Sequence, residues 1–321
     1  CAARMEIAMK TLLVPLDGSL LAEQILPYVR VLAPLLEARV RLVQVVPEIE
    51  TPSLLSENVA NIYSMSTPVG AQHERIHTVL ENTIANAESY LAERAQRLQE
   101  AGLDVTYDVQ SGPAADIIVE IAHAAHISMI AMATHGYSGL QRWALGSVAD
   151  RVVQVAPAPV FLIRATRYTP TKAYSLNRVL LPLDGSTLSL QALPIAREIA
   201  AKAQAELLLV EAVAPPIETY PSVPATPVPP YGTVLNALHE QASRQLNAVA
   251  AELRNDGLTV TPVVDNGHAA EVIVDEATRR NASLIVMATH GRGGLRRWAM
   301  GSVADKVLHA ATMPLVLVRA Q

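Results

Sequence analysis

Two glycine-rich loops of the same design carry the residues best suited to chemistry in this sequence. They span residues 133–147 and 288–302, and both read Ala-x2-Gly-x9-Gly-Ser. Glycine lets the backbone approach oxygen atoms closely, and the unpaired N–H groups at a helix start favour anions. The repeated spacing therefore predicts a di- or triphosphate site in each half of the chain.

The serine of each loop has a second interpretation. Ser147-Val-Ala-Asp150 and Ser302-Val-Ala-Asp305 fit the S-x-x-D capping-box pattern, in which the serine only completes a helix. Capping accounts for the serine but not for Gly136, Gly291 and the constant interval. We therefore favour phosphate binding.

Other polar residues of the loops are weaker signals. His135 and His290 are either phosphate contacts or local hydrogen-bonding residues. Arg142, Arg296 and Arg297 have the charge and the reach to contact a phosphate, but exposed arginine is also common on solvated surfaces.

Alternating apolar and polar periods predict the elements that position these loops. Each half opens with a short apolar run ending in Asp-Gly-Ser, at 11–17 and 178–184, which is typical of a buried strand followed by a turn and then a helix. Strand-like runs follow at 39–46 and 206–213. The segment Pro215 to Gly232 holds seven prolines and predicts an irregular loop.

Long helices with one apolar stripe come next, around 76–98 and 235–253, ended by Gly102 and Gly257. Near-continuously apolar strands that alternate with helices favour a doubly wound, mostly parallel sheet of five strands in each half, with helices on both faces. The remaining predicted elements are strands at 104–109, 128–133, 159–163, 259–264, 283–288 and 314–319, and helices at 113–125 and 268–280 and from 147 and 302.

Length and composition limit the class of protein. The 321 residues suggest two domains, which we place at 9–168 and 174–321 with a short polar linker between them. A net charge of −5 gives no broad basic surface for nucleic acid or anionic membranes. Cys1 is the only cysteine, and neither a secretory signal nor a membrane-spanning run is evident, so we expect a cytoplasmic protein.

These features together resemble the universal stress protein family in its tandem two-domain form. The resemblance rests on the aspartate after the first strand, the apolar fourth strand with its loop, and the closing Pro-Val or Pro-Leu strand, and it covers both halves. ATP-binding members carry Gly-x2-Gly-x9-Gly-(Ser/Thr). Here the first glycine is Ala133 or Ala288, which would hinder binding only if that residue needs positive φ or lies against the ligand.

The resemblance implies a Rossmann-like fold that binds ATP with Mg²⁺. The strand-one aspartates would face the ribose or the metal, although either could instead bond its own turn. Residues at the end of strand two would hold adenine by backbone groups, and the two strand methionines would line the base pocket or belong to the core. The implied contacts are Asp17, Val45, Met132, Ala133, His135, Gly136, Gly146, Ser147 and Val148 in the first half, and Asp184, Ala212, Met287, Ala288, His290, Gly291, Gly301, Ser302 and Val303 in the second.

The family also implies that the halves pair about a pseudo-two-fold axis through the edge strands at 159–163 and 314–318, and that the chain can form a homodimer. Partners other than an adenine nucleotide and a second copy are not indicated. We therefore interpret the chain as an ATP-binding signalling module of the stress response.

Three alternatives remain open. His73-Glu-Arg-Ile-His77 matches the zinc-protease pattern H-E-x-x-H, but it occurs in one half only and has no third ligand. An ATP hydrolase is the more serious alternative, but because no phosphate-binding Gly-x4-Gly-Lys-(Ser/Thr) occurs, we expect slow turnover at best. A nucleotide-free interaction protein of the same fold is the third.

Overall fold

A computed structural model describes residues 10–48, 69–125, 127–134, 145–166, 174–214, 231–290 and 300–319, with the backbone alone for 69–77 and 231. In the first half the elements are β1 (Lys10–Pro15), η1 (Ala22–Ile25), α1 (Leu26–Leu36), β2 (Ala38–Val46), α3 (Val69–Gln99), β3 (Val105–Ser111), α4 (Ala114–Ala124), β4 (Met129–Ala133), α5 (Ser147–Val155) and β5 (Val160–Ile163). In the second half they are β6 (Arg178–Pro182), η2 (Ser189–Ala192), α6 (Leu193–Ala203), β7 (Glu206–Val213), α7 (Tyr231–Asn255), β8 (Val260–Asn266), α8 (Ala269–Arg279), β9 (Leu284–Ala288), α9 (Ser302–Ala310) and β10 (Leu315–Val318).

The doubly wound α/β fold predicted from the sequence is confirmed. Within the described residues one sheet runs in the order β3-β2-β1-β4-β5-β10-β9-β6-β7-β8, and neighbours inside each half are parallel. The strand order reverses between β1 and β4 in the first half and between β6 and β9 in the second. These are the positions at which α/β sheets bind ligands.

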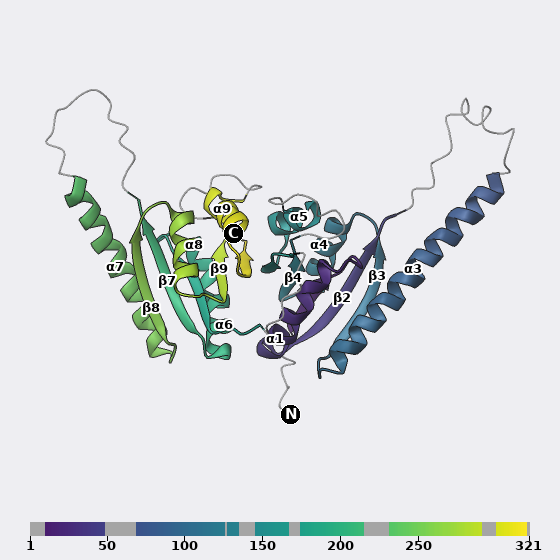
Figure 1. Cartoon of the computed structure of the whole chain (residues 1–321), viewed down its shortest axis with the longest axis horizontal. Coiled ribbons are helices and arrows are strands. Elements are labelled where there is room, and N and C mark those ends of the chain that lie inside the picture. The colour runs from purple at the N-terminus through teal and green to yellow at the C-terminus, as the bar shows by residue number, and fades with distance from the viewer. Residues whose placement is uncertain are drawn as a thin grey trace, which may run out of the picture.

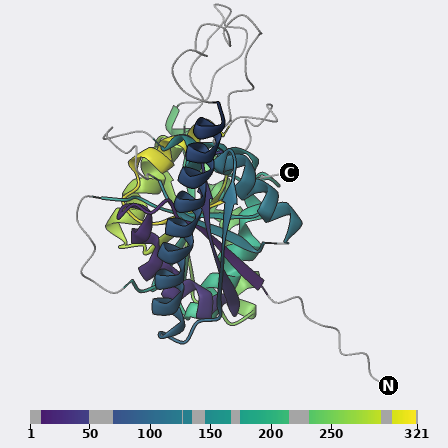
Figure 2. The same cartoon turned by 90° about the vertical axis from the view of Figure 1, so that its right-hand side faces the viewer.

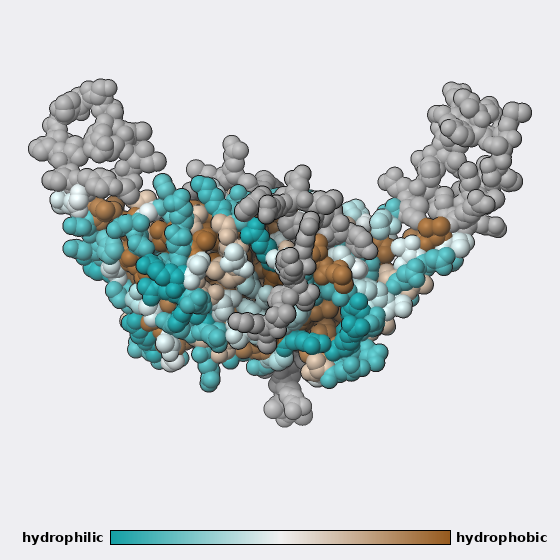
Figure 3. Space-filling model, in the orientation of Figure 1, coloured by the Kyte–Doolittle hydropathy of each residue, from teal (hydrophilic) through white to brown (hydrophobic). Residues whose placement is uncertain are grey.

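Helices cover both faces of the sheet, as Figure 1 shows for the two halves side by side. One apolar cluster lies under α1, α3, α6 and α7, and the other lies under α4, α5, α8 and α9. The strands β4 and β9 are buried along their whole length, as expected for parallel strands covered on both sides. Hydrophilic side chains predominate along the lower rim of the face in Figure 3.

The two halves meet along their last strands. β10 lies antiparallel to β5, with Leu315 opposite Leu162 and Leu317 opposite Val160. Tyr28 stacks at a tilt on Tyr174, with 4.5 Å between ring centroids, so an aromatic contact supports the junction below the strands.

Two long helices begin earlier in the chain than the apolar pattern of the sequence indicated. α3 starts at Val69, well before the apolar stripe at 76, and α7 starts at Tyr231, so Gly232 of the predicted irregular loop is helical. Residues 215–230 of that loop lie outside the described part. Backbone hydrogen bonding extends each helix before its apolar stripe begins, into residues where the apolar period gives no signal.

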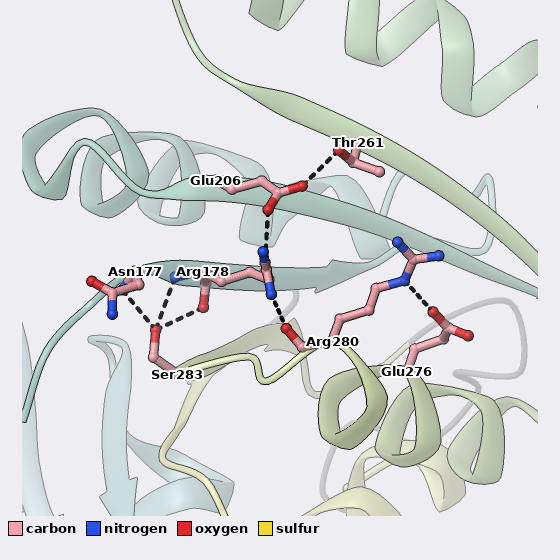
Figure 4. A network of polar contacts seen from close by, with 7 residues as sticks. All are labelled: Asn177, Arg178, Glu206, Thr261, Glu276, Arg280 and Ser283. Carbon is pink, nitrogen blue, oxygen red and sulfur yellow. Dashed lines mark hydrogen bonds and ion pairs between the residues drawn. The ribbon is translucent and has the colours of Figure 1, made fainter.

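Polar contacts hold together the edge of the second half at which its strands begin (Figure 4). Arg178 donates from Nε to Glu206 at 2.7 Å, and Thr261 donates to the other oxygen of Glu206 at 2.7 Å. Ser283 joins the start of β6 to the start of β9 by accepting the amides of Asn177 and Arg178, both at 3.1 Å. This network joins the amino-terminal ends of β6, β7, β8 and β9, at the opposite end of these strands from the predicted site.

Candidate functional site

The structure brings several predicted site residues together at the carboxyl edge of each half-sheet. Asp17 follows β1, and Met132 and Ala133 end the neighbouring strand β4. Asp184 and Ala288 occupy the same places after β6 and in β9. Both groups lie beside the point at which the strand order reverses. A ligand bound there can contact loops that leave the sheet on both sides of this point.

Each glycine loop is closed by one backbone hydrogen bond of the same length. The amide of Gly146 donates to the carbonyl of Thr134 at 2.8 Å, and that of Gly301 donates to Thr289 at 2.8 Å. A Cβ on Gly301 would lie 2.8 Å from the Thr289 oxygen, closer than real Cβ atoms come. Since φ of Gly301 is −64°, this glycine is required for close approach and not for a left-handed conformation.

The capping-box interpretation of the serines is wrong. Gly146 and Gly301 are the N-cap residues of α5 and α9, no side chain caps either helix, and Ser147 and Ser302 are already the first helical residues. The amides of the first turn have no acceptor within a helix. Because the cap glycine is already bonded to its own loop, any anion would use the amides that follow it.

The strand-one aspartates bond their own turns, as one interpretation predicted. Oδ1 of Asp17 accepts the amide of Ser19 at 3.0 Å. Oδ1 of Asp184 accepts both the amide of Ser186 at 3.0 Å and its hydroxyl at 2.6 Å. The turn therefore fixes the orientation of each carboxylate through one oxygen, and the second turn does so with two donors.

Backbone groups near the end of β2 and β7 face the site. The carbonyl of Val43 accepts the amide of Leu16, on the β1 side, whereas the carbonyl of Val46 accepts the amide of Gly112, on the β3 side. Because successive residues of a parallel strand direct their backbone to alternate edges, the N–H and C=O of Val45 point past the end of β1. In β7 the carbonyl of Val210 accepts the amide of Leu183, and that of Val213 accepts the amide of Gly267. The same alternation therefore directs the backbone N–H and C=O of Ala212 past the end of β6.

The alanines that replace the first motif glycine lie in ordinary strand backbone. Ala133 pairs with Ile163 and Ala288 with Val318, and the non-glycine residues with positive φ in the described part are Glu37, Gln204 and Asn281. A methyl group therefore causes no backbone strain at either alanine.

The other predicted contacts divide into two groups. Met132 and Met287 are buried in the core cluster beneath α5 and α9, against which Val148 also packs, while Val303 is exposed. Nδ1 of His290 lies 3.0 Å from the hydroxyl of Thr289, which fits a local hydrogen bond. The predicted residues that lie outside the described part are His135, Gly136, Gly291, Arg142, Arg296 and Arg297.

A polar cluster beside Asp17 was not predicted from the sequence. Arg94 of α3 donates to Glu23 of η1 at 2.9 Å, and its guanidinium lies over the ring of Tyr90, 4.8 Å from the centroid. Burial, together with the charges of Glu23 and Asp17, raises the pKa of Tyr90. No spacing rule relates η1 to α3, so only the fold could reveal this contact.

The described residues contain no arrangement typical of a metal centre or a membrane span. No group of three or more His, Cys, Asp or Glu residues there is placed to hold a metal ion, and the side chains of His73 and His77 lie outside that part. None of the described helices has both the length and the hydropathy of a membrane span.

Comparison with known proteins points to one family. The model of the universal stress protein family matches residues 9–164 and 175–319. A universal stress protein of Mycobacterium tuberculosis is 31% identical over 205 residues, which cover 63% of this chain and 64% of that protein. The universal stress protein YxiE of Bacillus subtilis is 28% identical over 146 residues, covering 44% of this chain and 99% of that protein.

Solved structures share the arrangement of the whole chain. A universal stress protein from Archaeoglobus fulgidus has a TM-score of 0.65 at 18% identity, over 97% of this chain and 96% of its own. A putative universal stress protein from Pseudomonas aeruginosa has a TM-score of 0.64 at 18% identity, over 98% of this chain and 94% of its own. At this identity the likeness shows the fold alone.

Proposed function

The chain belongs to the universal stress protein family, and we propose that it binds an adenine nucleotide, ATP with Mg²⁺, in each half. In this proposal the protein is a nucleotide-dependent module of the cytoplasmic stress response with little or no catalysis. The division into units at 9–168 and 174–321 stays a prediction.

The observation that carries the proposal is the uncapped helix start at both switch points. α5 and α9 each begin on a glycine without a side-chain cap, at the edge where Asp17 and Asp184 follow the first strand. First-turn amides and the positive end of the helix dipole favour a phosphate chain. The backbone of Val45 and Ala212 supplies one donor and one acceptor that suit the edge of a planar base.

The proposed roles follow from these positions. The amides after Gly146 and Gly301 would hold phosphate oxygens, and Asp17 and Asp184 would hold the ribose or a Mg²⁺ ion. ATP would supply the negatively charged phosphates, and the backbone amides of the chain would orient them. Glycine at the helix start keeps the loop closed, which is the part of the motif that the structure explains in steric terms.

Isothermal titration of the full chain with ATP, AMP and cyclic AMP, with and without Mg²⁺, tests this proposal. We expect ATP to bind at two sites per chain, with Asp17→Ala and Asp184→Ala each weakening one of them. Glu206→Gln, at the opposite edge of the sheet, is the matched control and should bind as the unmodified protein does.

Other outcomes of this experiment would replace the proposal. No heat with any of the three nucleotides would favour a nucleotide-free interaction protein of the same fold. Steady cleavage of ATP that disappears in the double variant Asp17→Ala, Asp184→Ala would instead make the protein an ATP hydrolase.

A further inference from the structure

The ten-stranded sheet ends in two outer strands, β3 and β8, that occupy equivalent places in the two halves. Backbone hydrogen bonds establish which residues face outward. Asp104 and Gly112 bond to β2, so the alternate residues Val105, Tyr107 and Val109 direct their N–H and C=O groups to the free edge. β3 and α3 lie on the flank that Figure 2 turns toward the viewer.

The same reasoning shows that the edge of β8 is blocked. Thr259 and Gly267 bond to β7, so Pro262 lies in the outward-facing set. Proline has no N–H, and it interrupts an outer edge against a further strand. Tyr107 stands at the equivalent position of β3, because each lies five residues before the glycine that bonds to the neighbouring strand. Proline thus closes one outer edge of the sheet, and along the other no further strand pairs within the described residues.

Side chains shield only the start of the open edge, where Gln99 of α3 donates from Nε2 to the carbonyl of Val105 at 3.0 Å. Natural edge strands are commonly shielded by lysine, proline or an unpaired charge. In β3 the one charged residue is Asp108, which accepts two bonds from Arg41, both at 3.0 Å, and one from Gln110 at 2.9 Å. The strand therefore presents a neutralised surface, with Tyr107 44% exposed.

We propose that the β3 edge is an interaction surface for a second copy of this chain, which adds its own β3 antiparallel about a two-fold axis. The sequence of β3 disfavours one of the two neighbouring registers. With Tyr107 opposite Tyr107 of the partner subunit, Val105 meets a valine and Thr106 meets Asp108 in trans, whereas the next register brings two aspartates face to face. Like charges directly opposite are destabilising, and cross-strand aromatic pairs stabilise.

The molecule itself favours a second copy over an unrelated strand. β5 and β10 already join the two halves by antiparallel pairing of short apolar strands, so this fold forms such a seam between its own units. The proposed contact is isologous, and a self-complementary strand closes it after two subunits. A single proline at the equivalent place in β8 prevents growth from the other end.

Sedimentation of the full chain over a range of concentrations tests the surface. We expect a concentration-dependent dimer that Tyr107→Pro abolishes and Tyr107→Phe retains. The fold has a natural precedent for proline here, because Pro262 occupies the equivalent outward position. Circular dichroism establishes whether the proline variant is folded.

Cross-linking gives an independent readout if the proline variant does not fold. In a Cys1→Ser background, Tyr107→Cys should form a disulfide-linked dimer, since directly opposite residues that exchange hydrogen bonds lie about 5.5 Å apart at Cα, within disulfide reach. Pro262→Cys in the same background should remain a monomer. A chain that is monomeric at all concentrations, a dimer that a folded Tyr107→Pro variant retains, or a Tyr107→Cys variant that does not cross-link would each overturn the proposal.

Discussion

The strand-one turn of the first half and that of the second half are built on the same backbone but packed by different side chains. In the first half Glu23 and Arg94 form an ion pair whose side chains are 18% and 15% exposed. The positions equivalent to these two hold Leu190, which is exposed, and Val249, which packs against the core, in the second half. In the turn of the second half, the hydroxyl of Ser186 also donates to Oδ1 of Asp184, at 2.6 Å.

This difference shows which part of the repeated unit is constrained. The loop closure at 2.8 Å is the same in both halves, whereas the layer behind the turn is polar in one half and apolar in the other. An apolar pair and an ion pair of similar volume are often close in stability. The glycine loop therefore limits the sequence more strictly than the packing beneath it does.

Replacing Arg94 alone with the residue type of the second half should give the largest change in the free energy of unfolding. Arg94→Val removes one partner and leaves the Glu23 carboxylate in a mostly buried position, which should lower the free energy of unfolding by about 2 kcal/mol. Adding Glu23→Leu reproduces the second half and should restore stability to within about 1 kcal/mol of the original. Denaturant unfolding of both variants measures this, and a double variant as unstable as the single one would contradict it.

Substituting the cap glycines tests the feature that the halves share. Gly301→Ala places Cβ against the Thr289 oxygen and should cost about 1–2 kcal/mol in unfolding free energy. Gly146→Ala should cost a similar amount because its loop closes at the same distance. Ser302→Ala is the control, since it makes no cap bond, and thermal unfolding should show a change below about 0.5 kcal/mol. Equal melting temperatures for Gly301→Ala and Ser302→Ala would refute the steric role.

Acid titration of Glu206 should give the smallest effect. A hydrogen bond from Thr261, with the bond and charge of Arg178, lowers the pKa of Glu206 below its ordinary 4.5 against the effect of burial. The stabilisation is therefore complete above pH 4.5 and is lost as the pH falls through the lower, folded-state pKa. The first half has Arg39 at the equivalent position, so no carboxylate titrates at that place in the first half.

Glu206→Gln should accordingly reduce the free energy of unfolding at pH 7 by about 0.5–1 kcal/mol, with the difference shrinking as the pH falls below 4.5. Glu240→Gln is the control, because its carboxylate is 73% exposed and 3.7 Å from Arg244. Unfolding curves recorded across this pH range measure the difference. A deficit of constant size at all pH values would mean that Glu206 acts through its shape and not through its charge.

The elements were largely predictable because the strands carry strong local signals. Leu12, Leu13 and Val14 form an unbroken apolar run, and such a run is typical of a strand covered on both faces. The site residues that follow strands, such as Asp17 and Asp184, were placed by the same patterns. The starts of α3 and α7 were not, since a helix can extend past its apolar stripe.

The sequence by itself determined the duplication, the order of strands and helices, and the two glycine loops, because period, glycine spacing and apolar runs are local properties. The tertiary structure decided that Gly301 closes on Thr289, that Glu23 meets Arg94, and that Pro262 and Tyr107 face outward from opposite ends of one sheet. Each of these depends on the distance or direction between segments far apart in the chain, which packing alone fixes.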